Sequence, residues 1–184
     1  MKKLLFVLFG LGLSVAGFAQ KLVPEIKKGT VLSSSAFVDG QQFPLQLTIK
    51  SMSGPVSIGW TVDGYGDGSF DMSDKALESA NKMALVSQPA LGVTKLADDE
   101  TFGIISKAAF KSLVDTKSVN YNGIKFNVKT GAESAIKLDG KEVDAIHFVS
   151  ETGKLEFWVL NNPAFPVILQ SVGMPTDIVV NSIK

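Results

Sequence analysis

The sequence predicts an α+β fold that is mostly β, with two short helices lying across one face of a curved antiparallel sheet. Over most of the chain, apolar and polar residues alternate with the period of two that is typical of half-buried strands. Helical periodicity is confined to two short segments near the middle. The turns between the alternating segments are short, which favours antiparallel neighbours.

The first residues form an export signal and stand outside this fold. Lys2 and Lys3 precede an apolar run over residues 4–15, and a small-x-small cleavage motif ends at Ala19. We therefore expect a signal peptide at 1–19, a single domain at 20–184, and a location in the periplasm or outside the cell. No later apolar stretch reaches the length of about 18 residues that spans a bilayer, so we expect no transmembrane segment in the mature chain.

The charged residues exclude several classes of partner and site. All 18 basic residues are lysine, they balance 18 acidic residues in the full chain, and there is no cysteine. Loss of the signal peptide leaves a weakly acidic domain. Nucleic acid is not an expected partner, because the chain has no basic stripe and no arginine for phosphate or base contacts. Without cysteine, disulfides and cysteine-type zinc sites are excluded.

The clearest early strands are expected at residues 45–50 and 56–62, where every second residue is apolar. Residues 51–55 between them predict a hairpin loop. Glycine and aspartate are concentrated in residues 63–71, which are expected to form a loop.

Two helices are expected next. Ser73 is the expected N-cap of a helix over 74–85, and Ser106 is the expected N-cap of a second helix that ends at Asp115. Residues 87–100 form the connector between them. The apolar stripes are Leu77, Ala80 and Ala84 in the first helix and Ala109, Phe110, Leu113 and Val114 in the second.

The last third of the chain predicts a hairpin followed by a meander. Asn122-Gly123 favours a type I′ turn, because both positions need positive φ. This turn pairs Tyr121 with Ile124 and Val119 with Phe126. Further strands are expected at residues 135–138, 141–150, 154–160, 165–172 and 178–183.

The spacing of acidic residues in the loop at 63–74 resembles that of a calcium-binding loop. Its acids, Asp63, Asp67, Asp71 and Asp74, fall at positions 1, 5, 9 and 12 of a calcium-type loop, with glycine at position 6. Tyr65 at position 3 and aspartate at position 12 depart from that pattern. The alternative interpretation is a Gly/Asp turn that leads into a helix cap, and we expect no metal site.

No catalytic constellation is evident, so the protein is not expected to be an enzyme or to need a cofactor. His147 is the only histidine, and no G-x-S-x-G elbow accompanies it. A histidine in a sheet, hydrogen-bonded to a neighbour, is the simpler interpretation.

Aromatic residues are concentrated in the expected strands. They predict either an ordinary packed core or a curved apolar surface around an apolar ligand. For the second case, ten residues are expected to line the cavity: Leu47, Ile49, Ile58, Trp60, Phe110, Leu113, Tyr121, Phe126, Phe157 and Val159.

The order of elements resembles that of the LolA-like domains, the fold of the outer-membrane lipoprotein carriers. Residues 45–62 correspond to an early hairpin, the two helices to the plug, and the segment from Leu138-Asp-Gly-Lys-Glu142 to Phe157-Trp158-Val-Leu160-Asn-Asn-Pro163-Ala-Phe165 to the rest of the sheet. The resemblance covers most of residues 22–184. It implies an unclosed antiparallel half-barrel with two helices packed in its concave face, and a concavity that the carriers use for acyl chains.

The missing arginine limits what this resemblance implies. The periplasmic carriers place an arginine at the site that controls ligand release, and no position here can take that role. We therefore expect the fold and the hydrophobic cavity but not lipoprotein transport. The first hypothesis is an exported, non-enzymatic carrier of an apolar, lipid-like ligand. The second is an interaction or assembly module of the cell envelope, with a filled core and a protein partner at a sheet edge.

Overall fold

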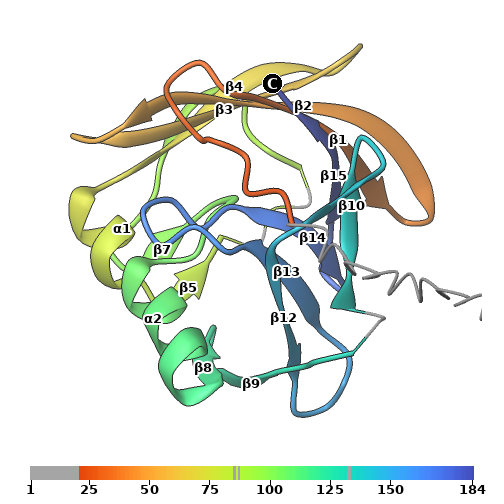
Figure 1. Ribbon diagram of the computed structural model, residues 1–184. Helices are drawn as coiled ribbons and strands as arrows, with labels where there is room; N and C mark the ends of the chain where they lie inside the picture. The colour runs from red at the N-terminus through yellow and green to blue at the C-terminus, as the bar shows by residue number, and fades with distance from the viewer. Residues whose placement is uncertain (1–20, 85, 87, 132–133) are drawn as a thin grey trace, which may run out of the picture.

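The computed structural model describes residues 21–84, 86, 88–131 and 134–184. The signal peptide expected at 1–19 lies outside the described residues. One large sheet dominates the fold (Figure 1). Its eleven strands lie in the order β6 (Gly92–Lys95), β4 (Gly66–Met72), β3 (Val56–Val62), β2 (Gln41–Met52), β1 (Val31–Val38), β15 (Asp177–Ile183), β14 (Ile168–Val172), β13 (Glu156–Leu160), β12 (Ala145–Ser150), β9 (Ile124–Val128) and β8 (Ser118–Tyr121).

The sheet is strongly bent and is not closed into a barrel. Strands β1 to β4 form one wall, β12 and β13 form another, and β14 and β15 connect them (Figure 1). Adjacent strands are antiparallel except for β4 and β6, which are parallel. The prediction of a mostly β fold with a large antiparallel sheet is confirmed.

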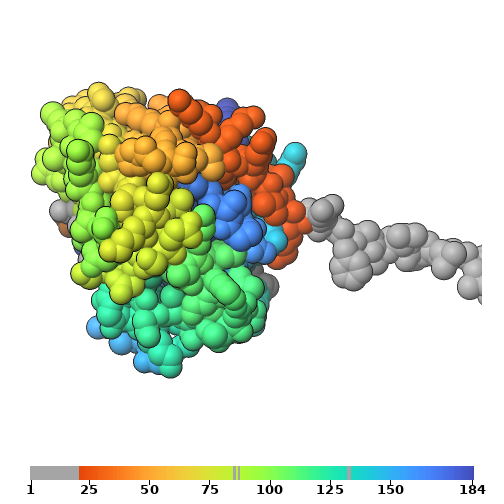
Figure 2. Space-filling view, turned by 90° about the vertical axis from the view of Figure 1, so that its left-hand side faces the viewer, coloured from red at the N-terminus to blue at the C-terminus, as the bar shows by residue number. Residues whose placement is uncertain are grey.

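Two helices and two small strand pairs complete the described structure. Helices α1 (Asp74–Ser79) and α2 (Lys107–Thr116) lie side by side on the side of the molecule away from β1 and β15 (Figures 1 and 2). The strand pairs are β5 (Lys82–Met83) with β7 (Glu100–Thr101), and β10 (Ile136–Leu138) with β11 (Lys141–Val143). Within the described residues, neither helix has the length and apolar character needed to cross a membrane.

The expected helix caps are confirmed. The Ser73 side chain accepts a hydrogen bond from the Ala76 amide, and Ser106 does the same for Ala109. The Ser106 hydroxyl also donates to the carbonyl of Ala80 at 2.6 Å, which joins the end of α1 to the start of α2. Because Ser106 is fully buried, both hydrogen bonds are shielded from water.

The core has two clusters that divide the inner side of the sheet. The first contains Leu47, Ile58, Trp60 and Phe70 from the early strands, with α1 packed at its edge. The second contains Phe110 and Leu113 of α2, packed on the inner side chains of β8, β9, β12 and β13: Val119, Tyr121, Phe126, Phe148, Phe157 and Val159. Helix α2 therefore fills the concave face over the late strands.

The Asn122-Gly123 hairpin is confirmed in detail. The two residues have φ values of 53° and 72°, and the pairs Tyr121–Ile124 and Val119–Phe126 form as expected. The Asn122 side chain has a second role, because its Oδ1 accepts a hydrogen bond from the Met83 amide at 2.7 Å. The turn thereby also holds β5.

Several predicted boundaries are wrong, and tertiary pairing explains them. The loop expected at 63–71 is a short turn followed by β4, since β4 pairs along its whole length with β3. The connector expected at 87–100 contains β6, and the first helix ends at Ser79 rather than at residue 85. Beyond it, Lys82 and Met83 pair with β7 instead of continuing the helix. Val114, expected on a buried stripe, is 40% exposed.

Candidate functional site

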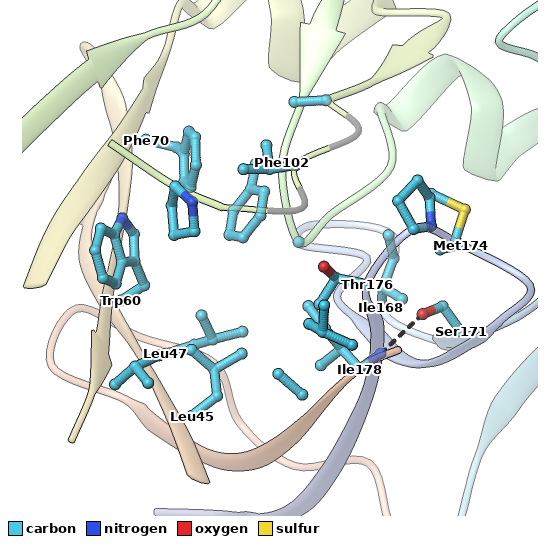
Figure 3. A pocket seen from close by; sticks show the side chains of 18 of the residues that line it. Leu45, Leu47, Trp60, Phe70, Phe102, Ile168, Ser171, Met174, Thr176 and Ile178 are labelled. Atoms are coloured by element: carbon cyan, nitrogen blue, oxygen red, sulfur yellow. Dashed lines mark hydrogen bonds between the residues drawn. The ribbon is translucent and has the colours of Figure 1, made fainter. Parts of the chain in front are cut away.

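A cavity of about 340 Å³ lies between the early strands of the sheet and the β14–β15 hairpin (Figure 3). The described residues that line it are almost all apolar, and none of them is charged. Its volume lies within the range of known small-molecule sites, which are typically lined by apolar and aromatic side chains.

The first wall comes from alternate residues of β1, β2 and β3. In the strand register, Ala36 is opposite Phe43, Leu45 is opposite Val62, and Leu47 is opposite Trp60. Directly opposed residues point to the same side of a sheet, so these side chains form one continuous apolar surface. The period of two in the sequence is therefore the origin of this wall.

The second wall comes from β14, β15 and the turn between them. Ile168 and Ile178 supply apolar surface, and Met174 extends it into the turn (Figure 3). The carboxylate of Asp177 fixes the turn, since it accepts hydrogen bonds from the amides of Gly173 and Met174, both at 3.0 Å. The mouth of the cavity consequently has an ordered boundary on this side.

Trp60 and Tyr65 connect the inner wall to the loop over the cavity. Their rings stack with centroids 5.8 Å apart, and the Tyr65 hydroxyl donates to the carbonyl of Pro89 at 2.7 Å. Trp60 is 2% exposed, and its indole nitrogen has no hydrogen-bond partner among the described residues. A buried donor of this kind is rare in native proteins.

The inner end of the cavity is aromatic. Phe70 and Phe102 stack at 4.1 Å, and both rings face the space between the walls (Figure 3). Phe70 is almost fully buried, whereas Phe43 and Tyr65 on the same cavity are each 39% exposed. This gradient places the opening at the turns and the closed end at Phe70.

Of the ten residues expected to line a cavity, three do so: Leu47, Trp60 and Phe157. The other seven do not line this cavity. Ile49 and Ile58 lie in the first core cluster, and the remaining five lie in the second: Phe110, Leu113, Tyr121, Phe126 and Val159. Neither α1 nor α2 contributes a described lining residue, so the cavity lies beside the helices and not beneath them.

Sequence reasoning missed most of the lining. Phe43 extends the alternation of Leu45 and Leu47, so a longer strand prediction would have included it. Phe102 and Met174 lie in irregular segments, where no periodicity indicates the direction of a side chain. Their place in the cavity follows from tertiary contacts alone.

The four acids of the calcium-like loop do not converge. Asp71 accepts a hydrogen bond from Ser57 at 2.6 Å, and Asp74 accepts one from the Gly54 amide at 3.1 Å. In the described part of the chain, no group of three or more histidine, cysteine, aspartate or glutamate residues could hold a metal ion. Residues 63–74 form a turn, strand β4 and the start of α1. The turn and the helix cap agree with the alternative interpretation, and the strand between them was not expected.

His147 lies within the sheet and is 2% exposed. Its Nε2 lies 2.7 Å from Glu156 Oε2, its Nδ1 lies 2.9 Å from Ser134 Oγ, and its ring stacks on Trp158 at 3.9 Å. These contacts tie β12 to β13 and to the segment before β10. They match the expectation of a hydrogen-bonded sheet histidine.

A comparison with protein-family models gives no match, and a search for similar characterised proteins also gives none.

Proposed function

We propose that the protein is an exported, non-enzymatic carrier or binding domain that holds an apolar chain in the cavity described above. The observation that carries this proposal is the uncharged, apolar lining of a space of about 340 Å³ that opens between surface turns. The export signal and the LolA-like order of elements support it. Transport of lipoproteins is not included, since the chain has no arginine.

The cavity can supply enough affinity for such a ligand. Each methylene group removed from water contributes about 0.8 kcal/mol, so a chain of about ten carbons gains about 8 kcal/mol before the costs of binding. Part of this gain is lost to immobilisation of the chain. Since 8 kcal/mol alone corresponds to a Kd of about 1 μM, a simple alkyl chain is expected to bind more weakly than this, with a Kd of about 0.1–1 mM.

A second candidate function is an assembly module of the cell envelope that pairs with a protein partner at a sheet edge. Strand β6 is an edge of the large sheet, and Val93 within it and Leu91 just before it are each 64% exposed. Exposed apolar residues on an edge strand favour addition of another strand. The cavity is not needed for this function.

Native mass spectrometry after mild extraction tests the first candidate directly. A co-purified apolar molecule, released when the protein unfolds, is the expected result. A titration with 1-decanol provides a second test, followed by the indole signals of the two tryptophans. Trp60 lines the cavity and Trp158 stacks on His147 away from it, so only the Trp60 signal should change.

Two matched variants complete the test. Val38→Phe places a ring at the cavity wall and should weaken decanol binding, because it fills space that the chain would occupy. Val93→Phe makes the same change at an exposed position outside the cavity and should leave binding unchanged. Binding that is insensitive to both variants, or absent from the unaltered protein, would contradict the carrier proposal.

A further inference from the structure

Trp60 carries a hydrogen-bond donor that the protein leaves without a partner. Across the described ranges of the chain, its Nε1 is the only buried side-chain nitrogen or oxygen that makes no hydrogen bond. The residue is 2% exposed and lines the cavity. A buried donor without an acceptor has lost its hydrogen bond to water and destabilises the folded protein. In the wall of a cavity, such a group points to a ligand that supplies the acceptor.

The unpartnered nitrogen lies toward the closed end of the cavity. Figure 3 shows it on the edge of the indole ring that is nearest Phe70. Cε2, the ring carbon bonded to this nitrogen, would stand 2.9 Å from a Cβ atom at Gly68, so this edge of the ring borders β4 and its neighbour β6. An acceptor at this point is surrounded by the apolar lining and lies away from the turns at the mouth.

The wall beside this edge of the ring can yield to a ligand. Nε1 is closed to water, so an acceptor reaches it only after a small shift of its neighbours. Strand β6 is the outermost strand of the sheet and is paired on one side only. Gly68 pairs with Gly92 of β6, and neither glycine has a side chain. A shift of β6 at this point therefore disturbs few contacts.

Other donors in the lining are used within the protein. The Ser171 hydroxyl donates to the carboxylate of Asp177 at 3.2 Å and accepts a hydrogen bond from the Ile178 amide at 2.9 Å (Figure 3). The Tyr65 hydroxyl donates to a backbone carbonyl at 2.7 Å. A ligand acceptor would have to break these hydrogen bonds before it could form new ones. The indole N–H of Trp60 has no such bond to lose.

The acceptor that fits Trp60 is an uncharged carbonyl oxygen. No described lining residue is charged, so a carboxylate or phosphate beside Trp60 would be buried without a counter-charge, at a cost that exceeds the gain from one hydrogen bond. A hydroxyl would accept the hydrogen bond, but it would bring a donor that needs its own partner. The carbonyl oxygen of an ester or a ketone accepts a hydrogen bond and brings no donor.

We propose that the cavity binds apolar molecules that carry an uncharged carbonyl group, whose oxygen accepts a hydrogen bond from Nε1 of Trp60. The inference rests on the proposed carrier function and adds the chemical class of the ligand to it. The hydrocarbon part of the ligand lies along the apolar wall, and Trp60 sets the depth at which the carbonyl group stands.

Two probes that differ only in the carbonyl group test the inference: butyrophenone and butylbenzene. Water solvates the ketone better than the hydrocarbon, so each probe is compared between the unaltered protein and Trp60→Phe, which keeps an aromatic ring and removes the N–H. The variant should bind butyrophenone about five- to tenfold more weakly, because one buried hydrogen bond is lost. Its affinity for butylbenzene should change by less than about twofold.

The indole N–H signals of the unaltered protein give a second measurement, which does not depend on a variant. Titration with 2-decanone, which has no aromatic ring, should move the Trp60 N–H signal downfield, as formation of a hydrogen bond requires. The Trp158 signal should stay in place, because that ring stacks on His147 away from the cavity.

Trp158→Phe is the matched control, since it makes the same change outside the cavity and should leave the affinities for both aromatic probes unchanged. An equal loss of both probes in Trp60→Phe, or a Trp60 N–H signal that does not move downfield when 2-decanone binds, would overturn the inference and leave the carrier function standing. Failure of all three probes to bind the unaltered protein would instead overturn the carrier function, and the inference with it.

Discussion

The indole ring of Trp60 lies so close to Gly68 that a Cβ atom at position 68 would stand 2.8 Å from the ring. The same atom would stand 2.5 Å from the carbonyl oxygen of Gly92 on the edge strand. Gly68 therefore determines where the wall of the cavity can lie, because it lets Trp60 and β6 approach β4. A glycine in a strand often marks such a close approach.

The Gly68→Ala variant should consequently be less stable, by about 1–3 kcal/mol, since either the indole or strand β6 must move. Denaturant unfolding followed by circular dichroism measures this loss. Gly59→Ala on β3 is the control, because its added carbon would meet only the flexible end of Lys50. A loss of equal size in both variants would show that general strand effects dominate and not the Trp60 contact.

The sheet and the caps could be predicted from the sequence because they depend on local chemistry. Alternation predicted β2 and β3, Asn122-Gly123 predicted a hairpin, and Ser73 and Ser106 predicted two helix starts. Strand β1 was missed because its sequence, Val31–Val38, contains three consecutive serines that hide the alternation. Strand β6 was missed because four residues with one parallel partner carry no recognisable pattern.

The candidate site could be predicted only in part. Leu47 and Trp60 face the cavity by the same alternation that predicts their strands. Phe110 and Leu113 were expected to line the cavity, but α2 packs on the late strands and both side chains lie in the second core cluster. Sequence periodicity indicates which side chains face inward, and it does not indicate where the inner side remains unfilled.

Replacement of Ser106 should lower the stability of the protein more than replacement of the other helix cap, Ser73. Ser106→Ala removes both the cap of α2 and the hydrogen bond to the Ala80 carbonyl, and it leaves that buried carbonyl without its donor. We expect the free energy of unfolding to fall by about 2–3 kcal/mol, compared with about 1 kcal/mol for Ser73→Ala, because the half-buried Ser73 hydroxyl donates its second hydrogen bond to the exposed carboxylate of Asp98, which water can solvate instead. Thermal unfolding of the two variants measures the difference. Equal losses would mean that the link between the helices contributes nothing.

Alkaline stability should depend on Tyr121. Burial raises the pKa of its hydroxyl, which lies 2.8 Å from the Thr101 hydroxyl. The folded state therefore holds the hydroxyl proton of Tyr121 more tightly than the unfolded state does. The stabilisation from the protonated hydroxyl is complete below the ordinary tyrosine pKa of about 10, and it is lost as the pH rises above that value. Tyr121→Phe should flatten the fall in stability between about pH 9.5 and 11. Denaturant midpoints across this range test the effect, and an unchanged slope would contradict it.

The length of the bound chain should depend on Phe102. This ring stacks on Phe70 at the closed end of the cavity, and it is only partly buried. Phe102→Ala should enlarge the cavity. It should lower the free energy of unfolding by less than the roughly 3–5 kcal/mol that is typical of removing a phenylalanine ring from a packed core. The buried Phe148 provides the comparison, through the variant Phe148→Ala. Each added methylene that enters the new space contributes about 0.8 kcal/mol, so the variant should favour longer alcohols than the unaltered protein does. A series from 1-octanol to 1-tetradecanol measures this shift. An unchanged preference for chain length would show that the chain does not reach Phe102, and would place the ligand nearer the turns.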